Sequence, residues 1–435
     1  MNETTLKPVI MKNIFKTIVP FFVLAALMTA CEDRTYERVT YEANVPVYMS
    51  YDEFRDSFLK SGPVEISRPG KIYFKDGYLF VNEYGKGIHV IDNADPSNPQ
   101  KKAFYEIPGN IDMAVRGDIL YADSYIDLVA IDISDIDNPK EVERLENVFP
   151  EAVPEGETGY TYSSVDTRKG VVVGWEVKTV TENREVYEQG GWRFDNMISF
   201  TALSESGNAW SAGAGVAGSM ARFMLNQEHL YLIAHPSVLK TVDTGSDTGM
   251  RVTDSVRVSR SMETLFRLGD KLFIGTTSGM LIYSLDNPAE PAYLSSYDHI
   301  TACDPVVTDG EYAYVTLRTG NMCGGNQNLL EVIDITSISN PYLVKSYPMF
   351  NPHGLGIDGN LLFICDGEAG LKIYDRDDPL DILNNKLAHY PGINTFDLIP
   401  VNGILMLIGD DGIYQYDYSD ILNIEQISHI VISNE

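Results

Sequence analysis

The feature that most constrains the fold is a segment of about 13 residues that recurs along the chain about every 41 residues. The clearest copies are GIHVIDNADPSNP (87–99), DLVAIDISDIDNP (127–139), GMLIYSLDNPAEP (279–291) and LLEVIDITSISNP (329–341), and weaker copies begin at Gly370 and Gly412. Equivalent positions are occupied by Asp92, Asp132, Thr201, Asp243, Ser284, Asp334, Asp375 and Asp417. Self-similarity at a fixed period indicates an architecture with one structural unit per repeat.

Each repeat contains four short apolar stretches. A turn and a strand precede each copy, as in GYLFVNEYG from Gly77, and further strands lie upstream and downstream. A four-stranded sheet cannot bury both faces alone, so such sheets pack face to face around an axis. The sequence therefore predicts an all-β fold, a β-propeller of about eight four-stranded blades over residues 63–435. Seven blades are the alternative if one degenerate repeat is an insertion.

The aspartate of each copy precedes a proline-rich turn, complete at Asp92, Pro96 and Pro99. Proline presets φ and is confined to turns and sheet edges, so this element fits the connection between the third and fourth strands. We therefore interpret these aspartates as turn formers rather than as metal ligands.

The strand sequences IHVID, LVAID and LEVID resemble those of the LVIVD-repeat family of bacterial propellers, of the Bacteroidota type. The resemblance extends from about Arg68 to the C-terminus, and the third and fourth repeats are degenerate. It implies a propeller and an extracytoplasmic location, and it implies no single activity.

The N-terminal residues 1–30 have the layout of a signal peptide with Met11 as the expected start. Two lysines precede an apolar run, Ile18 to Leu27, that is short for a membrane-spanning helix. The sequence MTAC follows, which is a lipobox ending at Cys31. We expect Cys31 to be acylated and to anchor the mature protein in a membrane.

Glu32 and Asp33 directly follow that cysteine, and an acidic pair there resembles the surface-export signal of Bacteroidota lipoproteins. We predict an outer-membrane lipoprotein exposed at the cell surface, and the same anchor facing the periplasm is the alternative. Residues 32–62 are predicted to form a tether, flexible over 34–44, and a short helix over 51–59. Ser50 and Glu53 are a possible capping box for that helix.

The formal net charge of −29, from 62 acidic and 33 basic residues, narrows the range of partners. Nucleic acids and anionic lipid surfaces repel such a chain, so neither is expected to bind it. No cofactor-binding motif is present, and we predict no cofactor.

Three cysteines fall near one another in the predicted propeller. Cys303 precedes the first strand of the sixth repeat and Cys323 lies in its long second-to-third loop, so export favours a disulfide between them. Cys365 is then left as a small buried thiol. A metal site of these three with His353 is the alternative, but the spacing matches no zinc pattern, and we predict no metal.

The loops from second to third strands and the connections between blades share one rim, which is the usual binding face of a propeller. The sequence places His235, Asp304, His353 and Asp366 on this rim. Imidazoles and carboxylates serve acid–base catalysis, but beside glycine or proline they usually cap turns, and we favour the turn-capping role.

The third repeat carries long insertions that contain all three tryptophans, Trp175, Trp192 and Trp210. Aromatic rings on a loop stack on sugars or anchor a protein partner, and packing of the insertion onto its blade is the alternative.

We therefore expect a binding or scaffold module that recognises a glycan, a peptide or an envelope protein through the rim. The alternative is an extracytoplasmic hydrolase or lyase that uses the rim histidines and aspartates. No nucleophile motif supports it, and the sequence assigns no catalytic residue.

Overall fold

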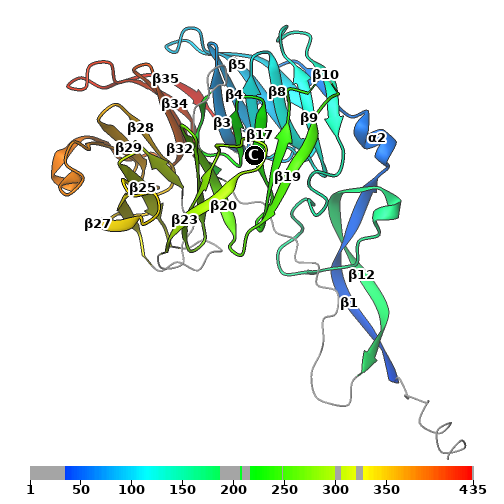
Figure 1. Cartoon of the computed structure of the whole chain (residues 1–435). Coiled ribbons are helices and arrows are strands. Elements are labelled where there is room, and N and C mark those ends of the chain that lie inside the picture. The colour runs from blue at the N-terminus through cyan, green and yellow to red at the C-terminus, as the bar shows by residue number, and fades with distance from the viewer. Residues whose placement is uncertain are drawn as a thin grey trace, which may run out of the picture. The chain divides into compact units, whose positions relative to one another are not determined.

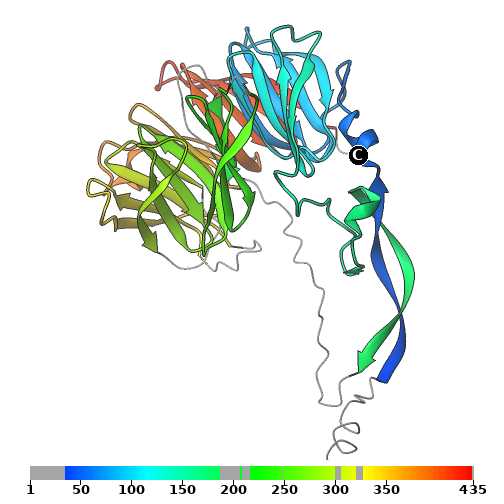
Figure 2. The same cartoon turned by 45° about the vertical axis from the view of Figure 1, so that its right-hand side comes forward.

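The computed structural model describes residues 35–186, 206–207, 216–246, 248–298, 305–319 and 327–433. The chain divides into two units (Figures 1 and 2). The larger unit comprises residues 46–155, 165–175 and 199–435, and the smaller comprises 1–45, 156–164 and 176–198. None of the described helices is long and apolar enough to cross a membrane.

The larger unit is a β-propeller in which seven antiparallel sheets repeat the same order of four strands. Blades 1 and 2 contain β3 (Pro69–Lys75), β4 (Tyr78–Glu83), β5 (Gly87–Asp92) and β6 (Gln100–Glu106), then β7 (Met113–Arg116), β8 (Ile119–Ser124), β9 (Asp127–Asp132) and β10 (Lys140–Leu145). Blades 3 and 4 contain β16 (Phe223–Asn226), β17 (His229–His235), β18 (Val238–Asp243) and β19 (Arg251–Arg257), then β20 (Met262–Leu268), β21 (Lys271–Thr276), β22 (Gly279–Ser284) and β23 (Ala292–Asp298). Blades 5 to 7 contain β24 (Val306–Thr308), β25 (Tyr312–Leu317), β26 (Leu329–Asp334) and β27 (Tyr342–Pro348), then β28 (Leu355–Asp358), β29 (Leu361–Cys365), β30 (Leu371–Asp375) and β31 (Lys386–Tyr390), then β32 (Thr395–Val401), β33 (Ile404–Gly409), β34 (Gly412–Asp417) and β35 (Glu425–Val431).

The first strands of the blades form a closed ring. Each of β3, β7, β16, β20, β24, β28 and β32 contacts the next one, and β32 contacts β3. The propeller fold is thus confirmed, and the ring closes with seven blades, the alternative that the sequence left open. The repeat predicted around Thr201 is the insertion, because β12 (Val171–Val186) pairs with β1 (Thr35–Met49) and not with a blade.

The strand β1 corrects the expectation of a flexible tether over residues 34–44. From Thr35 onward this segment is a strand, hydrogen-bonded to β12 on one edge and to β11 (Thr161–Tyr162) on the other. Valine, tyrosine and threonine in this stretch favour an extended backbone, but a strand also needs a partner, and the partner lies more than a hundred residues away.

The short helix α2 (Tyr51–Arg55) confirms the predicted N-cap. The hydroxyl of Ser50 accepts a hydrogen bond from the backbone N–H of Glu53 at 3.3 Å. The helix ends earlier than the predicted residue 59, because Leu59–Ser61 (β2) pairs with the outer strand β6 of blade 1.

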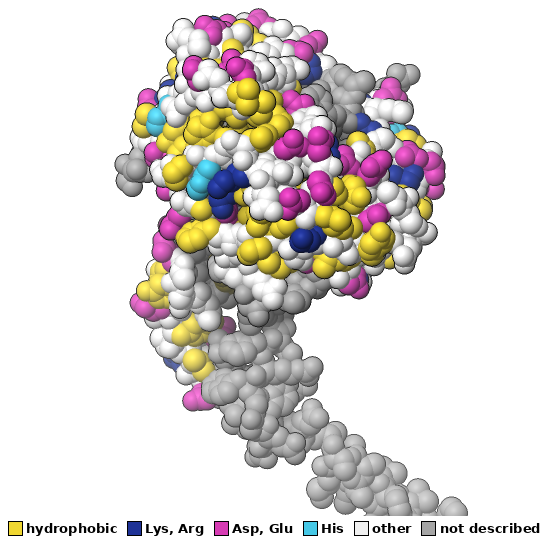
Figure 3. Space-filling model, turned by 90° about the vertical axis from the view of Figure 1, so that its left-hand side faces the viewer, with side chains coloured by type: hydrophobic (Ala, Val, Ile, Leu, Met, Phe, Trp, Pro, Cys, Tyr) yellow, Lys and Arg dark blue, Asp and Glu magenta, His cyan; other side chains and the backbone are white. Residues whose placement is uncertain are grey.

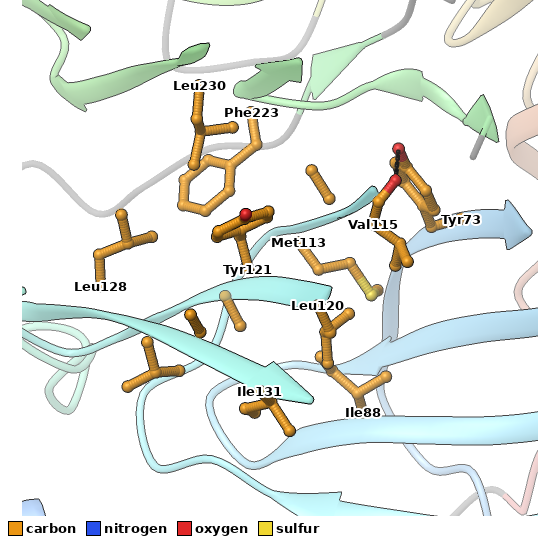
Figure 4. Packing of buried hydrophobic residues seen from close by; sticks show 14 of the residues in the cluster. Tyr73, Ile88, Met113, Val115, Leu120, Tyr121, Leu128, Ile131, Phe223 and Leu230 are labelled. Atoms are coloured by element: carbon orange, nitrogen blue, oxygen red, sulfur yellow. Dashed lines mark hydrogen bonds between the residues drawn. The ribbon is translucent and has the colours of Figure 1, made fainter. Parts of the chain in front are cut away.

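Alternating apolar residues pack the blades against one another. Figure 4 shows Ile88, Leu120 and Leu128 of blades 1 and 2 in one cluster with Phe223 of blade 3. Each is 2% exposed or less, and burial of a leucine or isoleucine side chain contributes about 1.5–3 kcal/mol.

The proline-rich turns have a second role that the sequence did not reveal. Tyrosine hydroxyls donate to turn carbonyls of the following blade: Tyr105 to Ile136, Tyr231 to Pro288, Tyr347 to Pro379 and Tyr390 to Ile424, at 2.8–2.9 Å. Within the turns, aspartates accept from the backbone two residues on, as Asp132 does from Ser134 at 2.9 Å. These contacts confirm the turn-forming role of the aspartates and show that the turns also tie neighbouring blades together.

Candidate functional site

The candidate site is the rim that carries the second-to-third strand loops and the connections between blades, which we call the loop rim. Four of the residues that the sequence predicted for this site lie in the part of the chain that the structure describes: Trp175, His235, His353 and Asp366. The other predicted positions lie outside the described residues: Cys31, Trp192, Trp210, Cys303, Asp304 and Cys323. The disulfide, the lipidation and the roles of those tryptophans therefore remain predictions.

His353 lies in the connection from blade 5 to blade 6 and is 7% exposed. Arg318 donates to its Nδ1 at 3.0 Å, and the Asn351 amide lies 3.2 Å from its Nε2. Since Nδ1 accepts, the proton of the neutral ring sits on Nε2. The Asn351 amide nitrogen faces Nε2, and turning the amide about its terminal side-chain bond brings its oxygen there to accept that proton. Burial, with the nearby Arg318 charge, lowers the pKa of His353 to about 3.

Asp366 at the end of blade 6's second strand is fully buried. Its carboxylate accepts from the backbone N–H groups of Phe350 and Asn351, at 3.0 and 2.8 Å, and pairs with Lys372. Asn351 thus links Asp366 to His353 in one network. Both groups hold the blade 5 to blade 6 connection in place, which supports the predicted structural role.

We expect His353 to show no titration between pH 5 and 8. A histidine whose pKa is lower in the folded protein binds fewer protons than in the unfolded chain, so its contribution to stability is lost as pH falls from about 6.5 towards 3. Histidine-selective NMR across this range, with His353→Gln to assign the signal, measures it. A mid-point near 6.5 would contradict the buried neutral ring.

His235 belongs to a separate network at the loop rim of blade 3. Its Nδ1 lies 2.8 Å from the Ser237 hydroxyl, and its Nε2 lies 3.3 Å from a carboxylate oxygen of Glu151. The structure therefore brings His353 and Asp366 together and leaves His235 with different partners.

Residues 149–155, which we call the strap, leave blade 2 along the loop rim and contact the blades on both sides. Glu151 meets His235 of blade 3. Glu155 accepts from the Tyr84 hydroxyl at 3.2 Å and pairs with Arg68 at 3.1 Å, both from blade 1. The guanidinium of Arg68 also lies 4.0 Å from the centre of the Tyr84 ring.

Trp175 is the described tryptophan of the insertion and is attached to the strap. Its indole N–H donates to the carbonyl oxygen of Pro154 at 2.8 Å, and the residue is partly exposed. The strap thus carries an aromatic and charged surface made of Trp175, Tyr84, Arg68 and Glu155. Sequence reasoning missed Tyr84 and Arg68, because both look like ordinary turn residues of a repeat.

Four buried charged residues lie on, or directly before, the first strands of four consecutive blades. Asp397, Lys71, Asp112 and Arg222 occupy equivalent positions in blades 7, 1, 2 and 3, so that negative and positive charges alternate. Each residue is 4% exposed or less. Lys71 Nζ lies 3.6 Å from Asp112 Oδ2, which also accepts from the Arg222 backbone N–H.

The segment 216–220 lies along the inner edge of the first strands, beside these charged residues. Its strand β14 (Val216–Ala217) pairs with the inner strand β3, and β15 (Ser219–Met220) contacts β32. Between them, Gly218 donates to the Ile72 carbonyl at 2.9 Å, and a Cβ on Gly218 would lie 2.0 Å from Asp397 Oδ2. Residues 216–220 therefore lie against the inner strands of blades 1 and 7.

The described residues include no group of three or more histidine, cysteine, aspartate or glutamate side chains placed to hold a metal ion. Cys365 is fully buried with a free thiol, and burial raises its pKa well above the usual value. Such a thiol is a packing residue.

Comparison with known proteins agrees with this architecture. The family model for the LVIVD repeat matches residues 70–106, 111–146 and 301–348, which cover blades 1, 2 and 5. These three segments are LVIVD repeats. None of the curated proteins matches the chain.

Solved structures resemble this chain at low sequence identity. The computationally designed Ika8 protein is 10% identical, with a TM-score of 0.50 over 86% of this chain and 90% of its own. BamB from Moraxella catarrhalis is 8% identical, with a TM-score of 0.47 over 88% and 97%. Hsv2 from Kluyvelomyces marxianus is 10% identical, with a TM-score of 0.45 over 86% and 100%.

Proposed function

We propose that this protein is a lipid-anchored, cell-surface propeller that binds a glycan, a peptide or an envelope protein, or scaffolds an envelope complex, through its loop rim. The observation that carries the proposal is the strap, which presents Trp175, Tyr84 and Arg68 on a closed seven-bladed ring. A rigid platform favours recognition because little conformational entropy is lost on binding.

Binding is favoured over hydrolase or lyase chemistry by the state of the predicted acid–base residues. A histidine with a pKa of about 3 is not protonated at neutral pH, and the Asp366 carboxylate already accepts three bonds. General acid–base catalysis needs a group whose pKa lies near the operating pH.

The anchor is tested on the full-length chain in a bacterial host. We expect the wild-type protein in the membrane fraction and Cys31→Ala in the aqueous fraction, because the acyl chains supply the hydrophobic attachment. Protease treatment of intact cells then separates surface display from the periplasmic alternative. Equal membrane association of both proteins would contradict lipidation at Cys31.

The binding role is tested by screening glycans alongside a pull-down from detergent-solubilised envelope. For a ligand so identified, we expect Trp175→Ala to weaken binding about tenfold, since a stacked aromatic contributes about 1–2 kcal/mol. Trp192→Ala tests the predicted anchor outside the described residues in the same assay. Tyr293→Ala, an exposed tyrosine on the outer strand β23, is the matched control. Unchanged affinity in both tryptophan variants would exclude the strap and the insertion as the binding surface.

A further inference from the structure

A pocket of about 350 Å³ opens beside the outer strand of blade 2. Residues 141–144 of β10 form one wall, and Arg55, Asp56 and Phe58 form the other. The strand β10 is the last of its sheet, so its outer edge has no paired strand in the described part of the chain. The pocket therefore adjoins a row of backbone groups that are open to pairing.

The two arginines of the pocket are already paired with carboxylates. Arg55 contacts Asp127 through Nε and Glu146 through Nη1, each at 3.0 Å. Arg144 makes two hydrogen bonds of 2.7 Å to Glu141. These pairs neutralise both cations and leave neither guanidinium as a site for an anion.

The remaining charge of the pocket is negative. The pocket lining contributes three carboxylates, and Asp127 and Glu146, which pair with Arg55, add two more. Five carboxylates against two arginines leave an excess of three negative charges. The three of the lining are Asp56, Glu141 and Glu143. Asp56 is exposed, and Glu143 uses one carboxylate oxygen to accept from the Met250 backbone N–H. Neither of these two has a basic partner among the contacts of the described residues, so the pocket lacks a third cation.

Blade 1 shows what the equivalent edge accepts. There the chain adds its own strand β2 to the outer strand β6, with Leu59 opposite Glu106 and Ser61 opposite Phe104. β10 is the outer strand of the next blade. It has a bulge between Glu141 and Glu143 like the one between Lys101 and Ala103 of β6, and Val142 in this bulge is 54% exposed. The outer edge of a blade in this propeller is therefore a competent template for an added strand.

We propose that an extended segment of a partner polypeptide pairs with the outer edge of β10 and places a lysine or arginine side chain in the pocket, between Asp56 and Glu143. Main-chain hydrogen bonds give the affinity, and the acidic pocket selects a basic side chain. The net charge of −29 attracts such a segment from a distance. The site goes beyond the rim-binding function and does not depend on it.

The test uses the full chain in detergent and a fluorescent, end-capped eight-residue peptide of alternating lysine and valine. We expect saturable binding at low salt that weakens about five- to tenfold in Glu143→Gln, because an interface charge pair is lost. Glu425→Gln, which removes an exposed glutamate from the outer strand β35, is the matched control and should bind as the wild type does.

Three further binding measurements can contradict the proposal. A peptide with glutamate in place of lysine that binds equally well overturns the charge selection. A peptide methylated at alternate backbone nitrogens that keeps full affinity overturns strand pairing. Spermidine that binds as tightly as the lysine peptide assigns the pocket to free polyamines. These measurements do not depend on whether the loop rim binds a ligand. Each of the two proposals can therefore be contradicted without the other.

Discussion

Gly279→Ala is expected to destabilise the propeller by about 3–5 kcal/mol. Gly279 opens the third strand of blade 4 with φ +136°, a region that alanine avoids. A Cβ there would lie 2.0 Å from the carbonyl oxygen of Tyr297 on the neighbouring outer strand, so the two strands would have to separate. Thermal and chemical unfolding measure the loss.

Gly62→Ala is the matched control for that substitution. A Cβ on Gly62 meets no atom within 4 Å, and we expect a change within about 0.5 kcal/mol. The same clash recurs at Gly87 and Gly370, where the carbonyl oxygens of Tyr105 and Tyr390 lie 2.0 Å from the added atom. If Gly279→Ala unfolds like Gly62→Ala, the explanation of these repeated glycines is wrong.

Asp123→Ala should destabilise the propeller by about 3–6 kcal/mol, whereas Asp123→Asn should not. One carboxylate oxygen of Asp123 accepts from the Asn110 amide and from the backbone N–H groups of Ile111 and Asp112, at 2.8–2.9 Å. Alanine would leave the two buried backbone donors without this acceptor, whereas the Asn110 amide would keep its bond of 2.8 Å to the Asp112 carbonyl. Asparagine keeps an acceptor oxygen in place. Comparison of the two unfolding free energies with that of the wild type tests this.

The stability difference between Asp123→Asn and the wild type should also depend on pH. Burial, with the neighbouring Asp112 charge, raises the pKa of Asp123 to about 6. Between about pH 4 and 6 the folded protein binds this proton more tightly than the unfolded chain does, so its contribution to stability decreases as pH rises through that window. Relative to the wild type, Asp123→Asn should therefore gain stability from pH 4.5 to 7.5, and a constant difference would exclude a raised pKa.

The local pattern of the repeats was predictable because it follows from short-range chemistry. A glycine opens or directly precedes the third strand in blades 1, 4, 6 and 7, and an aspartate ends it in six of the seven blades. Both mark positions where the backbone needs a particular conformation, and both can be read from the sequence. The N-cap of α2 at Ser50 is of the same kind, since donor and acceptor are three residues apart.

The long-range pairings were not predictable in this way. Residues 171–186 alternate like a blade strand, yet they pair with β1, and the expected tether became a strand for the same reason. Strand propensity states that a segment will be extended but not which edge it will join.

In the candidate site too, the positions of residues along the chain were predictable and their long-range contacts were not. The sequence placed His235, His353 and Asp366 on the loop rim by counting strands, and it placed Trp175 in an insertion of the third repeat. It could not show that Arg318 holds His353 as a neutral ring, or that Glu155 of the strap contacts Tyr84 and Arg68. These contacts join residues 35 or more positions apart, and only the packing of neighbouring blades brings them together.

The sequence by itself thus determined the propeller class, the repeat and its turns, because periodic alternation and turn chemistry act within a few residues. The tertiary structure decided that the blades number seven, that residues 216–220 pair with the inner strand of blade 1 and that four buried charges alternate on neighbouring blades. The number of blades depends on which inner strands meet when the ring closes, and that contact is made between the two ends of the propeller, β3 and β32.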